Sequence, residues 1–249
     1  MNTKKIVEKL IEIHESVPNR RTKFDINNPN WYDLDWDIEN YPYAFVLSCI
    51  MDRQIKAERA WQIVFKVCQE IGSFDFKDLA KLSEEEIKDI FNRKRLHRFN
   101  NMMAHYFYVA IKKIHEKYNN DAGKIWKECD SVKIVKKRFE EFAGIGPNIA
   151  NMAVNALYRE LKIPFKDPEN IDVKVDVHVK RVLKRTGIVS INASDEEIRI
   201  KAKQLCPEFP GKLDWAAWRI GQDYCQKSQP NCSLCPLTDY CSKINFVEE

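Results

Sequence analysis

Four cysteines lie within seventeen residues near the C-terminal end, and this grouping constrains the chain more than any other feature. They are Cys225, Cys232, Cys235 and Cys241, in the spacing C-x6-C-x2-C-x5-C. Thiolates prefer soft metals, so the grouping favours either a [4Fe–4S] cluster or a tetrahedral zinc ion. The segment is too short to have a hydrophobic core of its own. Spacing alone does not decide between iron and zinc.

Paired disulfides and four unrelated buried thiols are the alternatives for these cysteines. Disulfides persist in oxidising compartments. The first residues, MNTKKIVEKLIEIHESV, carry charges throughout and lack the apolar stretch of a secretory signal. They place apolar residues at helical spacing, so we expect a helix over Asn2–Val17 and a cytoplasmic location. The remaining cysteines lie among apolar neighbours and are expected to be buried thiols: Cys49, Cys68, Cys129 and Cys206.

Composition permits DNA binding without requiring it. The chain has 249 residues, 44% of them hydrophobic, and no apolar run approaches the length of a membrane span. The net charge is +4, which is mildly basic. Basic residues gather at Asn92–Arg98 and Lys133–Phe139. A solvated helix face is the usual meaning of one such run, and DNA contact is the alternative.

Helical periodicity dominates the chain and predicts an all-α fold. Ser83 with Glu86, and Ser194 with Glu197, match the capping box that starts a helix. Ser131 is expected to cap a further helix. The periodic segments are Tyr43–Met51, Ala57–Ile71, Ser83–Phe91, Asn100–Tyr118, Val132–Phe142, Pro147–Leu161, Val177–Thr186, Ser194–Leu205 and Leu213–Tyr224.

The stretch Ile163–Val175 interrupts this pattern. It contains two prolines and alternating polarity, so we expect an ordered loop. The loop leads into Asp176, directly before the helix that begins at Val177. An acid in this position is expected at the helix N-terminus, where an N-cap without any other role is the simpler interpretation.

A short turn flanked by two helices is the strongest motif in the middle of the chain. It reads FAGIGPNIAN, with Gly144 and Gly146 on either side of Ile145 and Pro147 suited to the first helical turn. Glycines remove side chains from such a turn. The backbone N–H groups at the start of the second helix can then bind a phosphate, so the motif is suited to holding DNA backbone without reading sequence. A tight helical hairpin without any ligand is the alternative.

The hairpin FAGIGPNIAN, the following VDVHVKRV and the four-cysteine spacing, in this order, resemble the endonuclease III branch of the helix-hairpin-helix DNA glycosylases. The resemblance implies iron rather than zinc, as a [4Fe–4S] cluster. It also implies two helical domains. One, over 41–160, is a central helical bundle with the hairpin, and the other, over 1–40 and 161–249, carries the cluster.

The resemblance also implies roles for individual residues. Asp176 matches the essential aspartate, which would stabilise the positive sugar as the N-glycosidic bond breaks, or activate water. Gln54 and Leu96 match wedges that enter the DNA stack when the target base is flipped, and the basic neighbours of Leu96 argue against an ordinary core leucine. Asn148 and Asp52 are expected to line the base pocket. The remaining DNA contacts are expected from Arg95, Gly144, Ile145, Gly146 and Lys227.

One departure from the family pattern concerns the chemistry. Bifunctional members carry a lysine that attacks the sugar, and this chain has Asn148 there, which cannot form a Schiff base. We therefore expect a monofunctional glycosylase that acts as a monomer, at the nucleoid, on double-stranded DNA with a damaged or mismatched base. Lys174 is an alternative amine for strand cleavage. A DNA-binding or damage-sensing homologue without activity, and an electron-transfer protein, are the alternatives of another class. Cys49 stands where the adenine-removing branch has a glutamate, which argues against that specificity.

Overall fold

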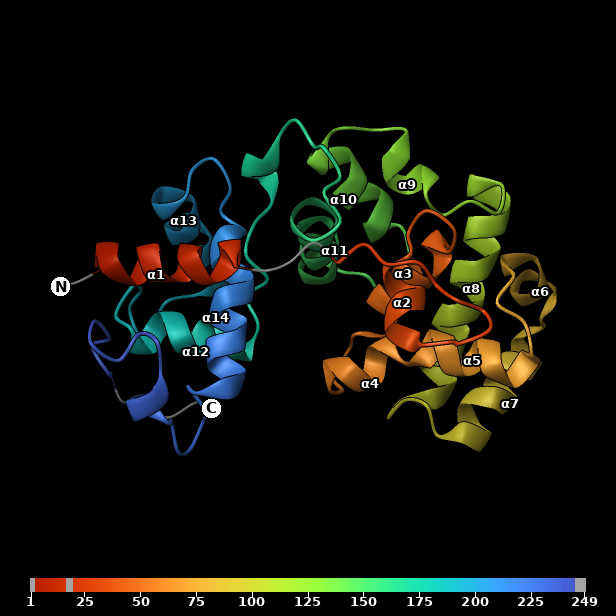
Figure 1. Cartoon of the computed structure of the whole chain (residues 1–249), viewed down its shortest axis with the longest axis horizontal. Helices are drawn as coiled ribbons and strands as arrows, with labels where there is room; N and C mark the ends of the chain where they lie inside the picture. Colours follow the sequence, from red (N-terminus) through yellow and green to blue (C-terminus); the bar gives the residue numbers. More distant parts are fainter. Residues whose placement is uncertain (1–2, 17–19, 245–249) are drawn as a thin grey trace. The chain divides into compact units, whose positions relative to one another are not determined.

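The computed structural model describes residues 3–16 and 20–244, and these residues form helices, turns and loops without any strand. The predicted all-α fold is confirmed. The chain divides into two compact units, coloured along the sequence in Figure 1. Unit 1 consists of 1–18 and 166–249, and unit 2 of 19–165. The segment 20–40 therefore belongs with the central bundle, whereas the sequence analysis placed it with the cysteine-bearing domain.

Unit 2 contains the helical bundle with the hairpin. The segment 20–40 packs against the rest of this bundle through aromatic contacts. Trp36 stacks on Trp61 with ring centroids 5.4 Å apart. Phe45, Trp126 and Phe139 form the aromatic centre of its core. Its helices are α2 (Trp31–Trp36), α3 (Pro42–Met51), α4 (Ala57–Trp61), α5 (Ile63–Ile71), α6 (Phe76–Lys81), α7 (Glu84–Lys94), α8 (Asn100–Tyr118), α9 (Lys124–Lys127), α10 (Val132–Glu140) and α11 (Pro147–Arg159).

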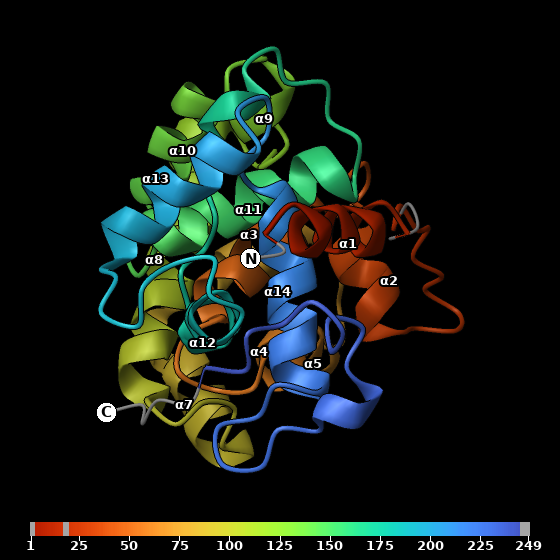
Figure 2. The same cartoon turned by 90° about the vertical axis from the view of Figure 1, so that its left-hand side faces the viewer.

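Unit 1 combines both ends of the chain. Its helices are α1 (Thr3–Glu15), α12 (Val177–Arg185), α13 (Asp195–Leu205) and α14 (Lys212–Asp223), and short 3₁₀ turns occur at Pro168–Asn170 and Cys232–Leu234. Helix α14 packs against both α1 and α12 (Figure 2). Ile6 and Leu10 of α1 lie in the same apolar core as Val179 and Ile220, which explains the apolar spacing of the N-terminal segment.

Local signals set several helix starts as predicted. Both capping boxes form, with Ser83 and Ser194 each bonded reciprocally to the glutamate three residues later. Ser131 is the N-cap residue of α10, but its side chain makes no capping hydrogen bond there. The expected N-terminal helix is confirmed over Thr3–Glu15, and its predicted ends at Asn2 and Val17 lie outside the described residues.

The expectation of four buried thiols outside the terminal grouping is only partly right. Cys49, Cys68 and Cys206 are buried, and burial raises the pKa of Cys68 to about 12. Cys129 is only half-buried. It follows the four-residue helix α9, and its thiol lies 3.8 Å from the Ser131 carbonyl oxygen.

Candidate active site and cysteine loop

Asp176 is the N-cap of α12. Its Oδ1 accepts hydrogen bonds of 2.9 Å from the backbone N–H groups of both His178 and Val179. These bonds satisfy orphan donors at the helix start and fix the orientation of the carboxylate. Within residues 3–16 and 20–244, the other oxygen, Oδ2, makes no hydrogen bond, and the residue is only half-buried. One carboxylate oxygen is thus anchored and the other is available.

The segment before Asp176 is held in unit 1 by burial and by backbone contacts, so the expected ordered loop is confirmed there. Val173 and Val175 are buried in the unit 1 core. Between them, the Lys174 N–H donates to Asp214 Oδ2 at 2.9 Å, and Asp214 is itself nearly buried. The alternating polarity of the sequence thus places apolar side chains inward and fixes the approach to Asp176.

Two buried arginines of α12 hold the start of the cysteine loop, which we define as residues 225–241. Arg181 donates to the carbonyls of Gly221 and Cys225 and contacts His178 Nδ1 at 2.9 Å. Arg185 donates to the carbonyls of Gln226 and Lys227, at 2.6 and 2.8 Å. The helix that presents Asp176 is therefore bonded directly to the loop. Neither arginine was predicted from the sequence, although their four-residue spacing on an amphipathic helix was a usable signal.

Helices α12 and α14 approach closely at Gly221. A Cβ atom at this position would lie 2.7 Å from the Cβ of His178 and 3.0 Å from its backbone oxygen. Any other residue would push the two helices apart. This close approach is what brings the Gly221 carbonyl within 2.9 Å of Arg181.

All four cysteines of the loop are free and half-buried. Burial raises the pKa of Cys235 and Cys241, and the negative charge of the neighbouring cysteine thiolates raises it further. Arg185 Nη1 lies 3.6 Å from Cys225 Sγ. Across the described ranges, no three histidine, cysteine or acidic side chains stand together as a ready metal-binding group. The donor set fits a soft metal in composition, and the thiols would have to close in around one.

The hairpin joins α10 to α11 in unit 2. Its apolar side chains anchor the turn, because Phe142 and Ile145 are buried, and the Ile145 N–H is bonded to the Phe142 carbonyl at 3.0 Å. Gly144 has φ +91°, and a Cβ there would meet Tyr106 Cδ2 at 2.7 Å. Gly146 is exposed and caps α11 without a side-chain hydrogen bond. The turn thus presents the uncapped start of α11, as the motif predicts, while Ile145 faces inward.

The other predicted site residues of unit 2 lie at helix ends. Asp52 is the C-cap of α3, and Asn148 is in the first turn of α11. Gln54 and Arg95 are exposed, and both have left-handed backbones, with φ 53° and 51°. Residues other than glycine rarely adopt this left-handed conformation, and those that do are most often Asn or Asp.

Leu96 follows Arg95 in the turn after α7 and is only 4% exposed. This corrects the argument against an ordinary core leucine, because the basic neighbours are exposed while Leu96 itself is buried. The helix ends at Lys94, and the left-handed Arg95 turns the chain back so that Leu96 points inward. In this conformation its side chain is not available to enter a DNA stack.

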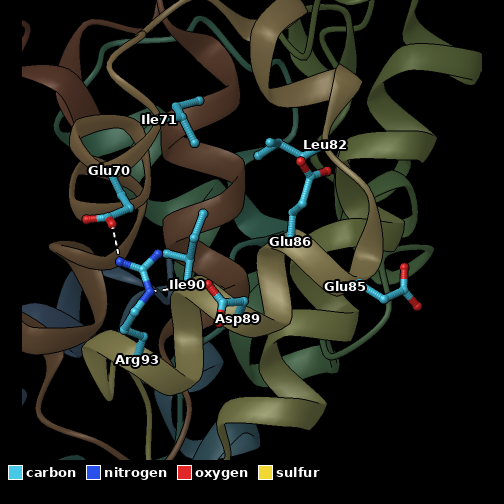
Figure 3. Close-up of a pocket in the computed structure, with 8 residues that line it drawn as sticks. All are labelled: Glu70, Ile71, Leu82, Glu85, Glu86, Asp89, Ile90 and Arg93. Carbon is cyan, nitrogen blue, oxygen red and sulfur yellow. Dashed lines mark hydrogen bonds and ion pairs between the residues drawn. The ribbon is translucent and has the colours of Figure 1, made fainter.

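A pocket of about 460 Å³ lies on unit 2 between α5 and α7 (Figure 3). Arg93 reaches across it to Glu70 Oε1 at 2.5 Å and to Asp89 Oδ2 at 3.2 Å. None of the predicted site residues lines it, and its acidic rim repels phosphate. The lining residues are Glu70, Ile71, Leu82, Glu85, Glu86, Asp89, Ile90 and Arg93. Lys227, by contrast, is exposed in the cysteine loop of unit 1.

No helix in the described part of the chain is both long and apolar enough to cross a bilayer.

Comparison with known proteins supports the motif analysis. Residues 47–208 match the family model described as HhH-GPD superfamily base excision DNA repair protein. The chain is 31% identical over 80 residues to an adenine DNA glycosylase of Arabidopsis thaliana, covering 30% of this chain and 13% of that protein. It is 31% identical over 113 residues to endonuclease III of Rickettsia felis, covering 44% and 46%. The chain thus spans less than half the length of these curated relatives.

The fold is similar to that of a solved endonuclease III trapped as a covalent intermediate with DNA, at a TM-score of 0.64 and 17% identity, covering 98% of this chain and 97% of that one. At this identity the likeness concerns the fold alone. The family model, however, spans well over half of the chain, including both the hairpin and Asp176. The chain therefore belongs to the HhH-GPD superfamily of base excision DNA repair proteins and has an endonuclease III-like fold.

Proposed function

We propose that this protein is a DNA glycosylase that hydrolyses the N-glycosidic bond of a damaged or mismatched base flipped out of double-stranded DNA. The observation that carries the proposal is the state of Asp176. One of its oxygens is anchored by two backbone N–H groups, and the other is available at the start of α12. A fixed carboxylate with a free oxygen suits a reaction in which positive charge develops on a sugar.

Asp176 would act on the sugar while the N-glycosidic bond breaks. As the bond between C1′ and the base nitrogen breaks, its electron pair leaves with the base, and the sugar becomes an oxocarbenium-like cation. The carboxylate stabilises this cation or takes a proton from the water that attacks C1′. The products are a free base and an abasic site.

The second part of the proposal is that the reaction stops at this stage. Asn148 occupies the hairpin position where a strand-cleaving enzyme needs an amine, and its amide cannot form a Schiff base. Together with Asp52, it is proposed to hydrogen-bond the flipped base. Lys174 is the alternative amine, and a homologue that binds DNA without chemistry is the alternative of another class.

DNA contact is proposed at exposed groups of each unit. In unit 2, the uncapped start of α11 at Gly144–Asn148 would hold a phosphate through backbone N–H groups, with Ile145 anchoring the turn from inside. Gln54 would enter the space left by the flipped base, and Arg95 would contact the backbone. In unit 1, the exposed Lys227 would contact phosphate.

The cysteine loop is proposed to carry a [4Fe–4S] cluster held by Cys225, Cys232, Cys235 and Cys241. Binding of the cluster would supply folding energy to a loop that has little core of its own. The donors from Arg181 and Arg185 already fix the loop's first carbonyls. These hydrogen bonds would hold Lys227 and α12 together within unit 1.

A panel of double-stranded oligonucleotides with deaminated, oxidised, alkylated or mismatched bases tests the proposal. The purified protein is expected to release at least one base, and Asp176→Asn to bind the same duplex without releasing it. Absence of release from every substrate by an iron-loaded protein that still binds the duplexes would favour the homologue without activity.

A further inference from the structure

Two loops of unit 2 are tied to each other by reciprocal contacts to backbone carbonyls. The Gln54 loop, residues 52–56, follows α3, and the Leu96 loop, residues 95–99, follows α7. Each loop contains one exposed, non-glycine residue in the left-handed region, Gln54 and Arg95 respectively. Such conformations are sparsely populated and persist where the surroundings hold them in place.

Arg59 supplies the first tie. It lies on α4, directly after the Gln54 loop, and its guanidinium reaches the end of α7. Nη2 donates to the Arg95 carbonyl at 2.6 Å, and Nε donates to the Leu96 carbonyl at 3.2 Å. These carbonyls follow the last turn of a helix, where they have no intrahelical partner. A guanidinium can serve both at once because its donors form a rigid planar fork.

His97 supplies the second tie, in the opposite direction. Its side chain is 2% exposed, and its Nδ1 accepts a hydrogen bond of 3.1 Å from the Phe99 N–H. The neutral ring therefore carries its proton on Nε2. This nitrogen is buried and has no hydrogen-bond partner among the described residues. The backbone carbonyls of Arg53 and Met51, at the end of α3, act to raise the pKa of His97 against the effect of burial.

We infer that Arg59 and His97 are positioning residues that lock the two loops into one rigid edge, so that Gln54 and Arg95 meet DNA in a preformed geometry. That DNA is the ligand rests on the proposed function. The lock itself rests on the geometry of these contacts. A preformed edge avoids the cost of ordering two loops when the duplex is opened. The Leu96 carbonyl is one end of the lock.

The hydrogen bond that His97 accepts from Phe99 is sensitive to acid. Burial lowers the pKa of His97 below the usual range of a histidine, and the positive charges of Arg59 and Arg98 lower it further, against the opposing effect of the Arg53 and Met51 carbonyls. A protonated Nδ1 cannot accept from the Phe99 N–H. Because the folded pKa is lowered, the contribution of the His97–Phe99 bond, which lies within the Leu96 loop, is present above the unfolded value and is lost as the pH falls through the folded value.

Hydrogen exchange of the free protein tests the lock without any catalytic readout. Arg59→Gln and His97→Phe are expected to raise exchange on the order of tenfold at the amides of both loops, because loss of one tie releases the opposite partner. His97→Gln, which keeps a donor near the Nε2 position, is expected to restore part of the protection. Arg98→Gln is the matched charge control, since Arg98 lies over the Phe99 ring and, within residues 3–16 and 20–244, donates no hydrogen bond to a carbonyl of either loop.

A duplex with 2-aminopurine beside the lesion provides the second readout. At saturating protein, Arg59→Gln and His97→Phe are expected to give several-fold less fluorescence gain from base extrusion. Arg98→Gln is expected to lower affinity and salt dependence only. Equal behaviour of Arg59→Gln and Arg98→Gln in both experiments would overturn the lock. If the wild type releases no base while the exchange pattern holds, the proposed function fails and the lock stands.

Discussion

Arg181 of α12 donates a hydrogen bond from Nε to the backbone carbonyl of Cys225, the first residue of the cysteine loop. Arg181 lies five residues after Asp176, which caps the same nine-residue helix. A displacement of the loop would therefore act on the helix that presents the carboxylate. This relationship gives the loop a role in placing Asp176 that does not depend on any redox chemistry.

Replacement of Arg181 by Met is expected to destabilise the fold and reduce iron loading. Its bonds to the carbonyls of Gly221 and Cys225 would be lost, and a buried carbonyl left without a partner costs about 1–3 kcal/mol. The free energy of unfolding should fall by about 2–4 kcal/mol, measured by denaturant titration alongside the iron content. Arg219→Met on α14 is the control, because Arg219 lies over the Trp215 ring and forms an exposed pair with Asp223, a kind of pair worth about 0–1 kcal/mol. Equal losses of unfolding free energy and of iron content in the two variants would show that Arg181 does not hold the cysteine loop.

Asp176→Asn separates catalysis from folding. Asparagine caps a helix about as well as aspartate, so the melting temperature should stay close to that of the wild type. Base release in single-turnover assays should fall by roughly 10²–10⁴-fold because the carboxylate charge is gone. Asp195→Asn, at the start of α13, is a matched control that should retain full activity. A large drop in melting temperature, with release lost in proportion, would show that Asp176 is only a cap.

The two hairpin glycines are expected to differ in what they contribute. Gly144→Ala should cost about 1–3 kcal/mol of unfolding free energy, because its φ is +91° and the new Cβ would meet Tyr106 at 2.7 Å. Gly146→Ala should be nearly neutral for stability, since its φ is −103° and nothing lies within 4 Å of the new Cβ. Its affinity for DNA should nevertheless fall, because a methyl group then stands where a phosphate would approach. The reverse assignment, in chemical denaturation and binding assays, would contradict the hairpin geometry.

Asp35 is expected to make stability depend on pH. It is fully buried on α2, and burial raises its pKa well above the usual value, against the bond of 2.9 Å from Ser48. Because the folded pKa is raised, its contribution is complete below the unfolded value of about 4 and is lost as the pH rises through the folded value. Asp35→Asn should therefore flatten the decline in unfolding free energy on the alkaline side. Asp33→Asn, half-buried on the same helix, should leave the decline unchanged. Parallel pH profiles for wild type and Asp35→Asn would refute this assignment.

The long helices and their caps were predicted correctly, because the sequence signals that specify them are local. The helix over Asn100–Tyr118 is found with the predicted bounds, and the capping boxes at Ser83 and Ser194 both form. The helices α2, α6 and α9 were not predicted, since four to six residues are too few to display a helical period.

The site was predictable only where a residue type matched a motif. Asp176 and the hairpin glycines stand at the expected backbone positions. Leu96 was misjudged because its burial depends on the left-handed turn at Arg95, which nothing in the local sequence specifies. Arg59 and His97 were missed for a similar reason. Their partners are carbonyls on another loop, and backbone atoms leave no pattern in a sequence.

Borohydride trapping tests directly whether the N-glycosidic bond is hydrolysed without a Schiff base intermediate. Wild-type protein, Asn148→Lys and Lys174→Gln would each be incubated with the lesion duplex and sodium borohydride, with base release and covalent adduct measured in the same reaction. We expect free base without adduct for the wild type and Lys174→Gln, and a trapped adduct for Asn148→Lys. A wild-type adduct that disappears in Lys174→Gln would contradict it and identify Lys174 as the amine.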